Sequence, residues 1–373
     1  MTKKIPLCKP SINQKEFKKI KEVLKSSWLT HGPFNEEFEE SFARYIGVKY
    51  ALTINSCASA LFASLKAQNI TGEVIIPSFT FVATANAVIT AGAVPVFADI
   101  DYLTGNTSIK HIKPLINSRT EAIIPVHFAG QSCQMDGITN LANKYKLALI
   151  EDSAEAIGAT FRNKKTGSFG TGCFSFFPTK NMTTGEGGMI TSNDAALIHK
   201  IKVLISHGID KTQNKKFIWQ RDAIMPGWNL RMSGILAGIG IEQLKKINKL
   251  NELRVKHSEY LTKRLDASLL ETPTTGSNSS HVYQMYTIKV KQEIRDELVA
   301  SLNREGVGAS VHFSPPVHKQ KLFKKFQKNK LPNTERLSSS IITLPMYPDL
   351  TKKDLDIIAD KTNKLIKKIY GKI

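Results

Sequence analysis

Residues 172–188 read GCFSFFPTKNMTTGEGG and place one lysine, Lys180, shortly after an apolar, aromatic run. That run, residues 173–177, has the composition of a buried strand, and Pro178 ends it. Lysine is rarely buried unless it is paired or chemically used. A desolvated amine also loses its proton more easily, as a Schiff-base nucleophile must. A surface lysine in a turn fits this stretch equally well, so the surrounding sequence has to decide.

The chain of 373 residues is long enough for two domains, or for a large and a smaller lobe. Hydrophobic residues make up 41% and charged residues 23%, which is typical of a globular protein with an ample core. The first residues are basic but lack the apolar run of a secretory signal. The most apolar stretch, residues 81–100, is interrupted by polar residues, glycine and proline, so we expect no membrane span.

Four cysteines are scattered along the chain, at Cys8, Cys57, Cys133 and Cys173. Their spacing matches neither a CxxC motif nor a Cys/His metal site. They fit reduced thiols in a cytoplasmic protein, and we expect no metal site.

The net charge of +20 raises the question of nucleic-acid binding. Much of the excess lies late in the chain, where lysines cluster in residues 319–330 and 352–372. Few aromatic residues are interleaved with them, and no helix-turn-helix, zinc-finger or RNA-recognition motif appears. We therefore expect a solvated lysine-rich surface and no nucleic-acid partner. Part of the positive field could still attract an anionic substrate.

The sequence before residue 172 alternates between short apolar runs and helical patterns. Expected strands cover 50–54, 74–77, 94–99, 122–127 and 147–152, with helices at 58–67, 80–90 and 136–145. This alternation predicts an α/β fold, with a mostly parallel sheet and helices on both faces. In such sheets ligands bind beyond the carboxyl ends of the strands. The segments that end at Ser56, Asp152 and Pro178 are therefore expected to share one site.

The chain changes character after a long helix expected at residues 234–265. Short strands expected at 282–290 and 311–313 alternate with helices at 294–305 and 351–370. This pattern predicts a second, smaller α+β domain. We place the boundary so that residues 1–245 form the large, cofactor-binding domain and residues 246–373 the small C-terminal domain.

The junction Ser56-Cys57-Ala58-Ser59 lies between an expected strand and the start of a helix. Exposed backbone N–H groups there, together with the helix dipole and the Ser59 hydroxyl, would form a phosphate site. A serine that merely caps the helix is the common alternative.

Two other strand ends carry informative side chains. Asp152 ends a buried strand, and a buried carboxylate needs a cation or strong donors. A protonated pyridine nitrogen is one such cation, although Asp152 could also cap the next helix, with Glu155 in its first turn. Phe81 could cover a planar cofactor, although aromatic residues at such places are usually core. With Lys180, and Ser175 five residues before it, these parts match pyridoxal 5′-phosphate (PLP).

Motifs that run in order along nearly the whole chain also resemble a known family. They are SCASAL at 56–61, PSFTFVAT at 77–84, EDSAEA at 151–156, FSFFPTKN at 174–181, GEGG at 185–188, GWNLRM at 227–232, PVH at 316–318 and LPMYP at 344–348. They are similar to the motifs of the DegT/StrS family of PLP-dependent nucleotide-sugar aminotransferases. This resemblance implies the aspartate aminotransferase fold, known as fold type I.

The resemblance also implies roles for individual residues. Lys180 would form the Schiff base with the cofactor. Asp152 would pair with the pyridine nitrogen, Glu155 would lie near the ring hydroxyl, and Phe81 would stack on the ring. Glu155 stands where many relatives carry glutamine or histidine.

The resemblance further implies that Ala58, Ser59 and Ser175 hold the cofactor phosphate. Many relatives have Gly-Thr where this chain has Cys57 and Ala58, so Ser59 would replace the usual threonine hydroxyl. Family members are homodimers with shared active sites, and Asn229 would reach the phosphate in the neighbouring subunit. For the substrate, Arg231 is a candidate for the diphosphate, and His312 and His318 are candidate contacts, although a lone histidine is more often structural.

The implied activity moves an amino group from L-glutamate, leaving 2-oxoglutarate, to a nucleoside-diphosphate-linked keto-sugar. We expect amination at C4 of a 4-keto-6-deoxyhexose, for a surface glycan such as lipopolysaccharide. A PLP-dependent sugar dehydratase and a 3-keto-sugar aminotransferase are alternatives, and a basic nucleic-acid-binding regulator is a remote one. Specificity is expected to depend on loops at 28–34, 211–228 and 312–321.

Overall fold

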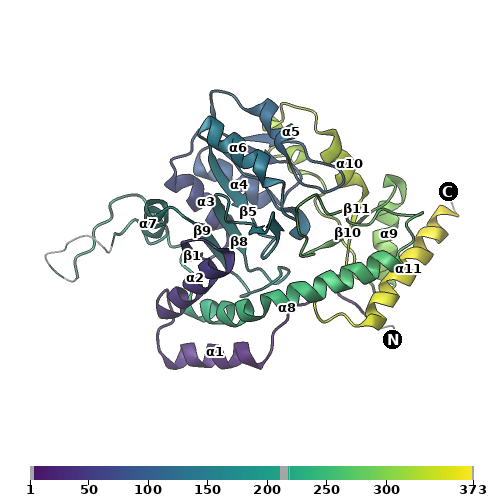
Figure 1. Ribbon diagram of the computed structural model, residues 1–373, viewed down its shortest axis with the longest axis horizontal. Helices are drawn as coiled ribbons and strands as arrows, with labels where there is room; N and C mark the ends of the chain where they lie inside the picture. Colours follow the sequence, from purple (N-terminus) through teal and green to yellow (C-terminus); the bar gives the residue numbers. More distant parts are fainter. Residues whose placement is uncertain (1–3, 211–216, 218, 372–373) are drawn as a thin grey trace.

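The computed structural model describes residues 4–210, 217 and 219–371. A seven-stranded sheet in the order β1-β9-β8-β5-β4-β2-β3 forms the centre of the molecule (Figure 1). Its strands are β1 (Tyr50–Ile54), β2 (Glu73–Pro77), β3 (Val94–Ala98), β4 (Thr120–Ile123), β5 (Ala148–Asp152), β8 (Thr171–Ser175) and β9 (Gly188–Ser192).

Strands β8, β5, β4, β2 and β3 run parallel to one another, which confirms the mostly parallel sheet. Strand β9 is the exception, because it runs antiparallel to both β8 and β1. Its first residue, Gly188, is paired with Ser175 on one side and with Ile54 on the other. The register therefore brings the end of β8, and with it the lysine loop, beside the end of β1.

Helices cover both faces of the sheet. They are α1 (Gln14–Lys25), α2 (Pro33–Ile46), α3 (Cys57–Ala67), α4 (Val82–Ala91), α5 (Ile109–Ile112), α6 (Met135–Tyr145), α7 (Ala195–Leu204) and the long α8 (Gly234–Arg264). Because strand side chains alternate between faces, Cys173 lies in a core with α3, α4 and α7. Its neighbour Phe174 lies in a core with α2 and α8. A further core places α6 over β2 and β4.

The C-terminal part forms a second body with its own core. Strand β10 (Tyr286–Lys289) pairs antiparallel with β11 (Ile341–Leu344), and α9 (Gln292–Arg304), α10 (Pro332–Ser340) and α11 (Lys352–Tyr370) accompany them. Ile5, near the start of the chain, joins this core and bridges Val307. Helix α8 runs from beneath the large sheet to this second body (Figure 1). A domain boundary at residue 245 would fall inside α8 and stays a prediction.

Two expectations about the second body were incomplete. Strand β11 was not anticipated, and the strand expected at residues 311–313 is wrong: Ser310 makes an isolated bridge to Thr343, after which the chain leaves the sheet. The reason is that the next residues, His312 and Phe313, turn to line a cavity. Among the described residues, no helix combines the length and apolarity needed to cross a membrane.

Candidate active site

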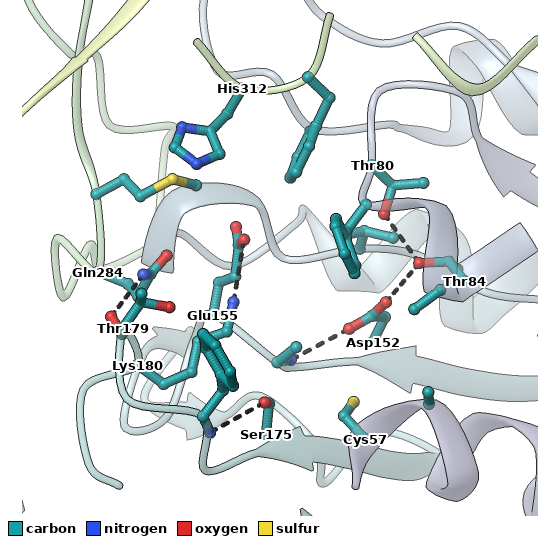
Figure 2. A pocket seen from close by; sticks show the side chains of 18 of the residues that line it. Cys57, Thr80, Thr84, Asp152, Glu155, Ser175, Thr179, Lys180, Gln284 and His312 are labelled. Carbon is teal, nitrogen blue, oxygen red and sulfur yellow. Dashed lines mark hydrogen bonds and ion pairs between the residues drawn. The ribbon is translucent and has the colours of Figure 1, made fainter. Parts of the chain in front are cut away.

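A cavity of about 410 Å³ opens at the carboxyl ends of the sheet strands, and the second body closes it from above (Figure 2). Ser56, Asp152 and Phe177 all line it, so the three strand-end segments do meet at one place. The second body contributes His312, Phe313, Gln284, Met285, Leu344 and Met346, and the start of the chain contributes Leu7 and Cys8.

Lys180 projects into this cavity from the loop that follows β8. Its backbone N–H donates to Phe177 O at 2.9 Å, which closes a tight turn, and the Thr183 hydroxyl donates to Phe176 O at 2.8 Å. The Lys180 side chain is 16% exposed, and its Nζ lies 3.4 Å from Glu155 Oε1. The amine is thus largely removed from water and held by an acid.

Asp152 lies at the end of β5 and is 6% exposed. Its carboxylate accepts hydrogen bonds from the Thr84 hydroxyl at 2.7 Å and from Ala154 N–H at 3.2 Å. Burial raises the pKa of Asp152, and the hydrogen bond from Thr84 opposes that rise. Within the described part of the chain it forms no ion pair. A buried carboxyl facing a cavity without an ion-pair partner is suited to a cationic ligand.

Glu155 is buried beside Lys180 and is fixed from the opposite side. Its Oε2 accepts a hydrogen bond from Ala129 N–H at 2.8 Å, while Oε1 faces the amine. Ala129 itself follows His127, whose backbone N–H donates to Asp152 O. The two acids of the site are therefore held by one connected stretch of backbone.

The start of α3 provides an anion site. The Ser56 hydroxyl caps the helix by accepting from Ser59 N–H at 3.1 Å, and it also donates to Ser59 Oγ at 3.0 Å. The first helical N–H groups, at Cys57 and Ala58, have no partner within the helix, and both residues line the cavity, as does Ser175. Ser59 does not line it, so a contact between its hydroxyl and a phosphate stays a prediction.

Phe81 stands at the N-terminus of α4 and leaves 62% of its surface exposed, unusual for a large apolar side chain unless something covers it. It lines the cavity, and its ring centroid lies 6.4 Å from that of Phe313. This position suits an aromatic side chain that covers a flat ligand.

The four candidate substrate and subunit contacts fall in different places. His312 lines the cavity, its Nδ1 lies 2.7 Å from the Thr343 hydroxyl, and burial lowers the pKa of the ring, which is therefore neutral at pH 7. His318 is fully buried, with Nδ1 2.6 Å from the Ser78 hydroxyl and Nε2 3.4 Å from Glu335. These polar groups hold the ring outside the cavity lining, and the expected contact of His318 with substrate stays a prediction.

Asn229 and Arg231 lie outside the cavity lining of the single chain. Asn229 is exposed and forms an isolated bridge to Ser206, and Arg231 is partly exposed. The loop expected at 211–228 lies partly outside the described residues.

Comparison with known proteins identifies the kind of site. Residues 10–363 match the DegT/DnrJ/EryC1/StrS aminotransferase family. The chain belongs to this family. It is 35% identical over 379 residues to the spore coat polysaccharide biosynthesis protein SpsC of Bacillus subtilis, covering 97% of each chain.

Two further members of the DegT/DnrJ/EryC1/StrS family are informative. The UDP-4-amino-4-deoxy-L-arabinose–oxoglutarate aminotransferase of Shewanella sediminis is 34% identical over 383 residues, which cover 97% of this chain and 98% of that one. The structure of S. venezuelae DesV in complex with a ketimine intermediate superposes with a TM-score of 0.90 at 27% identity, covering 98% of this chain and 99% of that one. The present chain is thus a PLP-dependent sugar aminotransferase of this fold.

The residues of this family member fit PLP. The buried Asp152 carboxyl, which has no ion-pair partner among the described side chains, suits the ring nitrogen. The free N–H groups at the start of α3 suit the phosphate, and the Lys180 amine suits the aldehyde. The described residues contain no group of three or more His, Cys, Asp or Glu side chains placed to hold a metal ion.

Among the cavity residues that the sequence did not predict, Thr84 and Gln284 make hydrogen bonds to residues of the site. Thr84 lies inside the PSFTFVAT motif, one helical turn after Phe81, and that spacing could have suggested a side chain facing Asp152. Gln284 carries no such signal, because it reaches the cavity from the second body.

Proposed function

We propose that this enzyme transfers the amino group of L-glutamate to a nucleoside-diphosphate-linked keto-sugar, at C4 of a 4-keto-6-deoxyhexose. One observation carries the chemistry: the amine of Lys180 and the carboxyls of Asp152 and Glu155 share a single cavity. The Shewanella sediminis relative supports a nucleotide-linked acceptor, nitrogen at C4 and the donor pair, since its name specifies a UDP-linked 4-amino sugar and oxoglutarate. Its sugar is a pentose, so the 6-deoxyhexose rests on the family resemblance alone.

Each residue then has a task. PLP, when bound, supplies a ring that stabilises negative charge on the donor carbon. The amine of Lys180 would serve as the general base that accepts the proton from that carbon and as the acid that gives it up again. Asp152, fixed by Thr84, would hold the protonated ring nitrogen, and Glu155 would lie near the ring hydroxyl.

The remaining side chains orient the reactants. The backbone at Ala58, together with Ser175, holds the phosphate, and Phe81 covers the ring and excludes water from one face. His312, neutral at pH 7, contacts the substrate as a hydrogen-bonding group and not as a cation.

We further propose that a second copy of the chain completes the site. Among the described lining residues Lys180 is the one cationic side chain, since His312 is neutral at pH 7, and there is no arginine. The substrates, however, carry two carboxylates and a diphosphate, which arginine and backbone donors usually bind. Asn229 and Arg231 lie in the segment between α7 and α8, where Asn229 is exposed and Arg231 is partly exposed. They reach the partner's cavity in this proposal.

A panel of nucleoside-diphosphate 4-keto and 3-keto sugars, each incubated with L-glutamate, tests the assignment. Mass spectrometry should show replacement of the keto oxygen by an amine, together with one equivalent of 2-oxoglutarate. NMR of the product should place the nitrogen at C4. Loss of water without gain of nitrogen would instead indicate the dehydratase, and nitrogen at C3 would overturn the regiochemistry. A role in surface-glycan synthesis and a cytoplasmic location stay predictions.

A further inference from the structure

Helix α8 buries polar side chains on the face that it turns toward the lysine loop. Gln243, Asn251 and Arg254 are 1%, 8% and 3% exposed. Helices normally bury apolar side chains, and a buried polar group costs free energy unless it is hydrogen-bonded. The partners of these side chains therefore indicate what they are for.

Asn251 holds the residue that follows Lys180. Its Oδ1 accepts a hydrogen bond from Asn181 Nδ2 at 2.6 Å, and its own Nδ2 donates to Ile157 O at 2.9 Å. The same Asn181 nitrogen lies 3.2 Å from Val282 O. Asn181 is thus fixed between α8 and the segment that leads into β10.

Gln284 holds the residue that precedes Lys180. Its Nε2 donates to Thr179 O at 2.9 Å (Figure 2). A carbonyl oxygen can only accept, so this contact fixes which end of the amide faces Thr179. The backbone of Gln284 is fixed in turn, because the guanidinium of Arg254 donates to Gln284 O at 3.4 Å and to Met346 O at 2.7 Å.

The two contacts bracket the reactive amine. The loop's own hydrogen bonds, such as Lys180 N–H to Phe177 O, shape the turn but do not tie it to the rest of the protein. Asn251 and Gln284 supply that attachment at the two positions flanking Lys180, from segments 70 and 105 residues away.

We infer that Asn251 and Gln284 are positioning residues for Lys180, which direct its amine toward the cavity by holding the side chain of Asn181 on one side of it and the carbonyl of Thr179 on the other. The inference rests on the role proposed for Lys180. A displacement of about 1 Å at a reacting group can cost about 10²-fold in rate. Loss of either anchor should therefore slow proton transfer while leaving substrate affinity nearly unchanged.

The test compares Gln284→Met and Asn251→Ala with a matched control, Gln131→Met. Gln131 is also buried, at 2% exposure, and its Nε2 donates to the carbonyl of Thr274 at 2.9 Å, in a loop outside the cavity. Each of the three variants loses a buried side-chain amide that is hydrogen-bonded to a backbone carbonyl or to another side-chain amide. All three should therefore lose similar thermal stability. If Gln284→Met fails to fold, Gln284→Glu keeps the shape and removes the donor.

Two readouts separate positioning from general damage. In the PLP-loaded enzyme with L-glutamate, kcat should fall about tenfold or more while KM changes less than about threefold. In the protein freed of cofactor, competitive labelling with an amine reagent, followed by peptide mass spectrometry, should show an altered rate and altered pH dependence at Lys180. The control should stay within about twofold of wild type in both.

Labelling and kcat within twofold of the control in both test variants would overturn the inference. That outcome leaves the proposed function intact as long as Lys180→Ala remains inactive. If Lys180→Ala turns over normally, the proposed function itself fails, and the two failures are therefore distinguishable.

Discussion

Lys180 and Asp152 differ in the charged partners that the protein gives them. The lysine amine already has an acid beside it, since Glu155 Oε1 lies at 3.4 Å. The Asp152 carboxyl has hydrogen bonds from Thr84 and Ala154 but no ion pair with any described side chain. The resting site is thus prepared for one group that is both an aldehyde and a cation, which is what the loaded cofactor provides.

Replacing Lys180 with alanine removes the covalent partner and the proton carrier at once. We expect turnover to fall by about 10²- to 10⁴-fold or more, as for loss of a general acid–base group. The visible absorption of the lysine-bound cofactor should disappear as well. Absorption spectra and steady-state rates measure both effects, with Lys110→Ala as an exposed-lysine control. Wild-type turnover in the Lys180 variant would contradict the assignment.

The raised pKa of Asp152 predicts how the stability of the cofactor-free protein depends on pH. Because the folded-state pKa lies above the ordinary value of about 3.9, folding favours the neutral acid. The stability that this provides is present below about pH 4 and is lost as the pH rises through the folded value. In the cofactor-free protein at pH 7, Asp152→Asn should therefore raise Tm, by about 1–3 °C if the gain is under 1 kcal/mol.

Adding PLP should reverse that order. The wild-type carboxylate gains a cationic partner, whereas asparagine does not, so the rise in Tm on loading should be larger for wild type. Differential scanning fluorimetry at pH 4 and pH 7, with and without PLP, provides four Tm values for wild type and four for the variant. An Asp152→Asn variant that gains as much from PLP as wild type would argue against a contact with the ring nitrogen.

The sequence motifs around Lys180 and Asp152 singled out both residues, although neither residue alone decided its role, and the structure places both in one cavity. The sequence could not separate His312 from His318. Both are single histidines in the same polar loop, and only the packing of Ser78 and Glu335 around His318 decides that its ring stays out of the cavity. The position of Gln284 in the site could not be predicted either, because its hydrogen-bond partner, Thr179, lies 105 residues away in the sequence.

Among the elements, the junction of β9 with α3 decides whether the phosphate can bind. Gly188 approaches so closely that a Cβ on it would lie 2.6 Å from Ser56 C and 2.8 Å from Cys57 N. Gly188→Ala must therefore displace the start of α3 or the neighbouring backbone of β8, where Phe174 O would lie 2.8 Å from the new Cβ. We expect the Kd for PLP to rise about tenfold, equivalent to ~1.4 kcal/mol.

Gly240→Ala is the matched control, because its Cβ would lie 2.4 Å from Phe38 in the core beneath α8, away from the cavity. Overpacking of this kind costs about 1–3 kcal/mol in stability. Both variants should therefore melt earlier, and fluorescence titration should show weaker PLP binding for Gly188→Ala alone. Equal Kd values would show that the junction does not set the phosphate site.

Among the helices and strands, the hydrophobic periodicity of the sequence predicted most of the large sheet and the helices that cover it. Alternating strands and helices leave few other arrangements, and strand ends must then meet at one edge. The antiparallel direction of β9 and the presence of β11 could not be read in the same way. Ile341–Leu344 has only four residues, apolar except for Thr343, and is too short for its period to distinguish strand from helix.

Over the whole molecule, the charge distribution bears on how the site is completed. The chain carries a net charge of +20, yet the described lining of its cavity contains three acids, Asp152, Glu155 and Glu186, with Lys180 and no arginine. The positive surface can attract anionic sugar nucleotides from a distance. Close binding of their diphosphate requires cations that a partner subunit would bring.

Mixing inactive variants tests this sharing. Lys180→Ala and Asn229→Ala should each be weak or inactive as homodimers. In a mixed dimer, one site combines Lys180 from one subunit with Asn229 from the other, so activity should return after unfolding and refolding the two together. Size-exclusion chromatography with light scattering checks that the species is a dimer. Absence of recovery from properly formed mixed dimers would indicate sites built from one chain.

The Asp152 carboxyl at the end of β5, which has no ion-pair partner among the described residues, also affects the stability of the protein before the cofactor binds. Newly made chains that have not yet met their vitamin B6 derivative carry this charge unneutralised, so they open more often and meet proteases more often. Nutrient shortage would then lower the amount of enzyme in the cell as well as the fraction that works. Its half-life after synthesis stops should lengthen when pyridoxine is added to the growth medium.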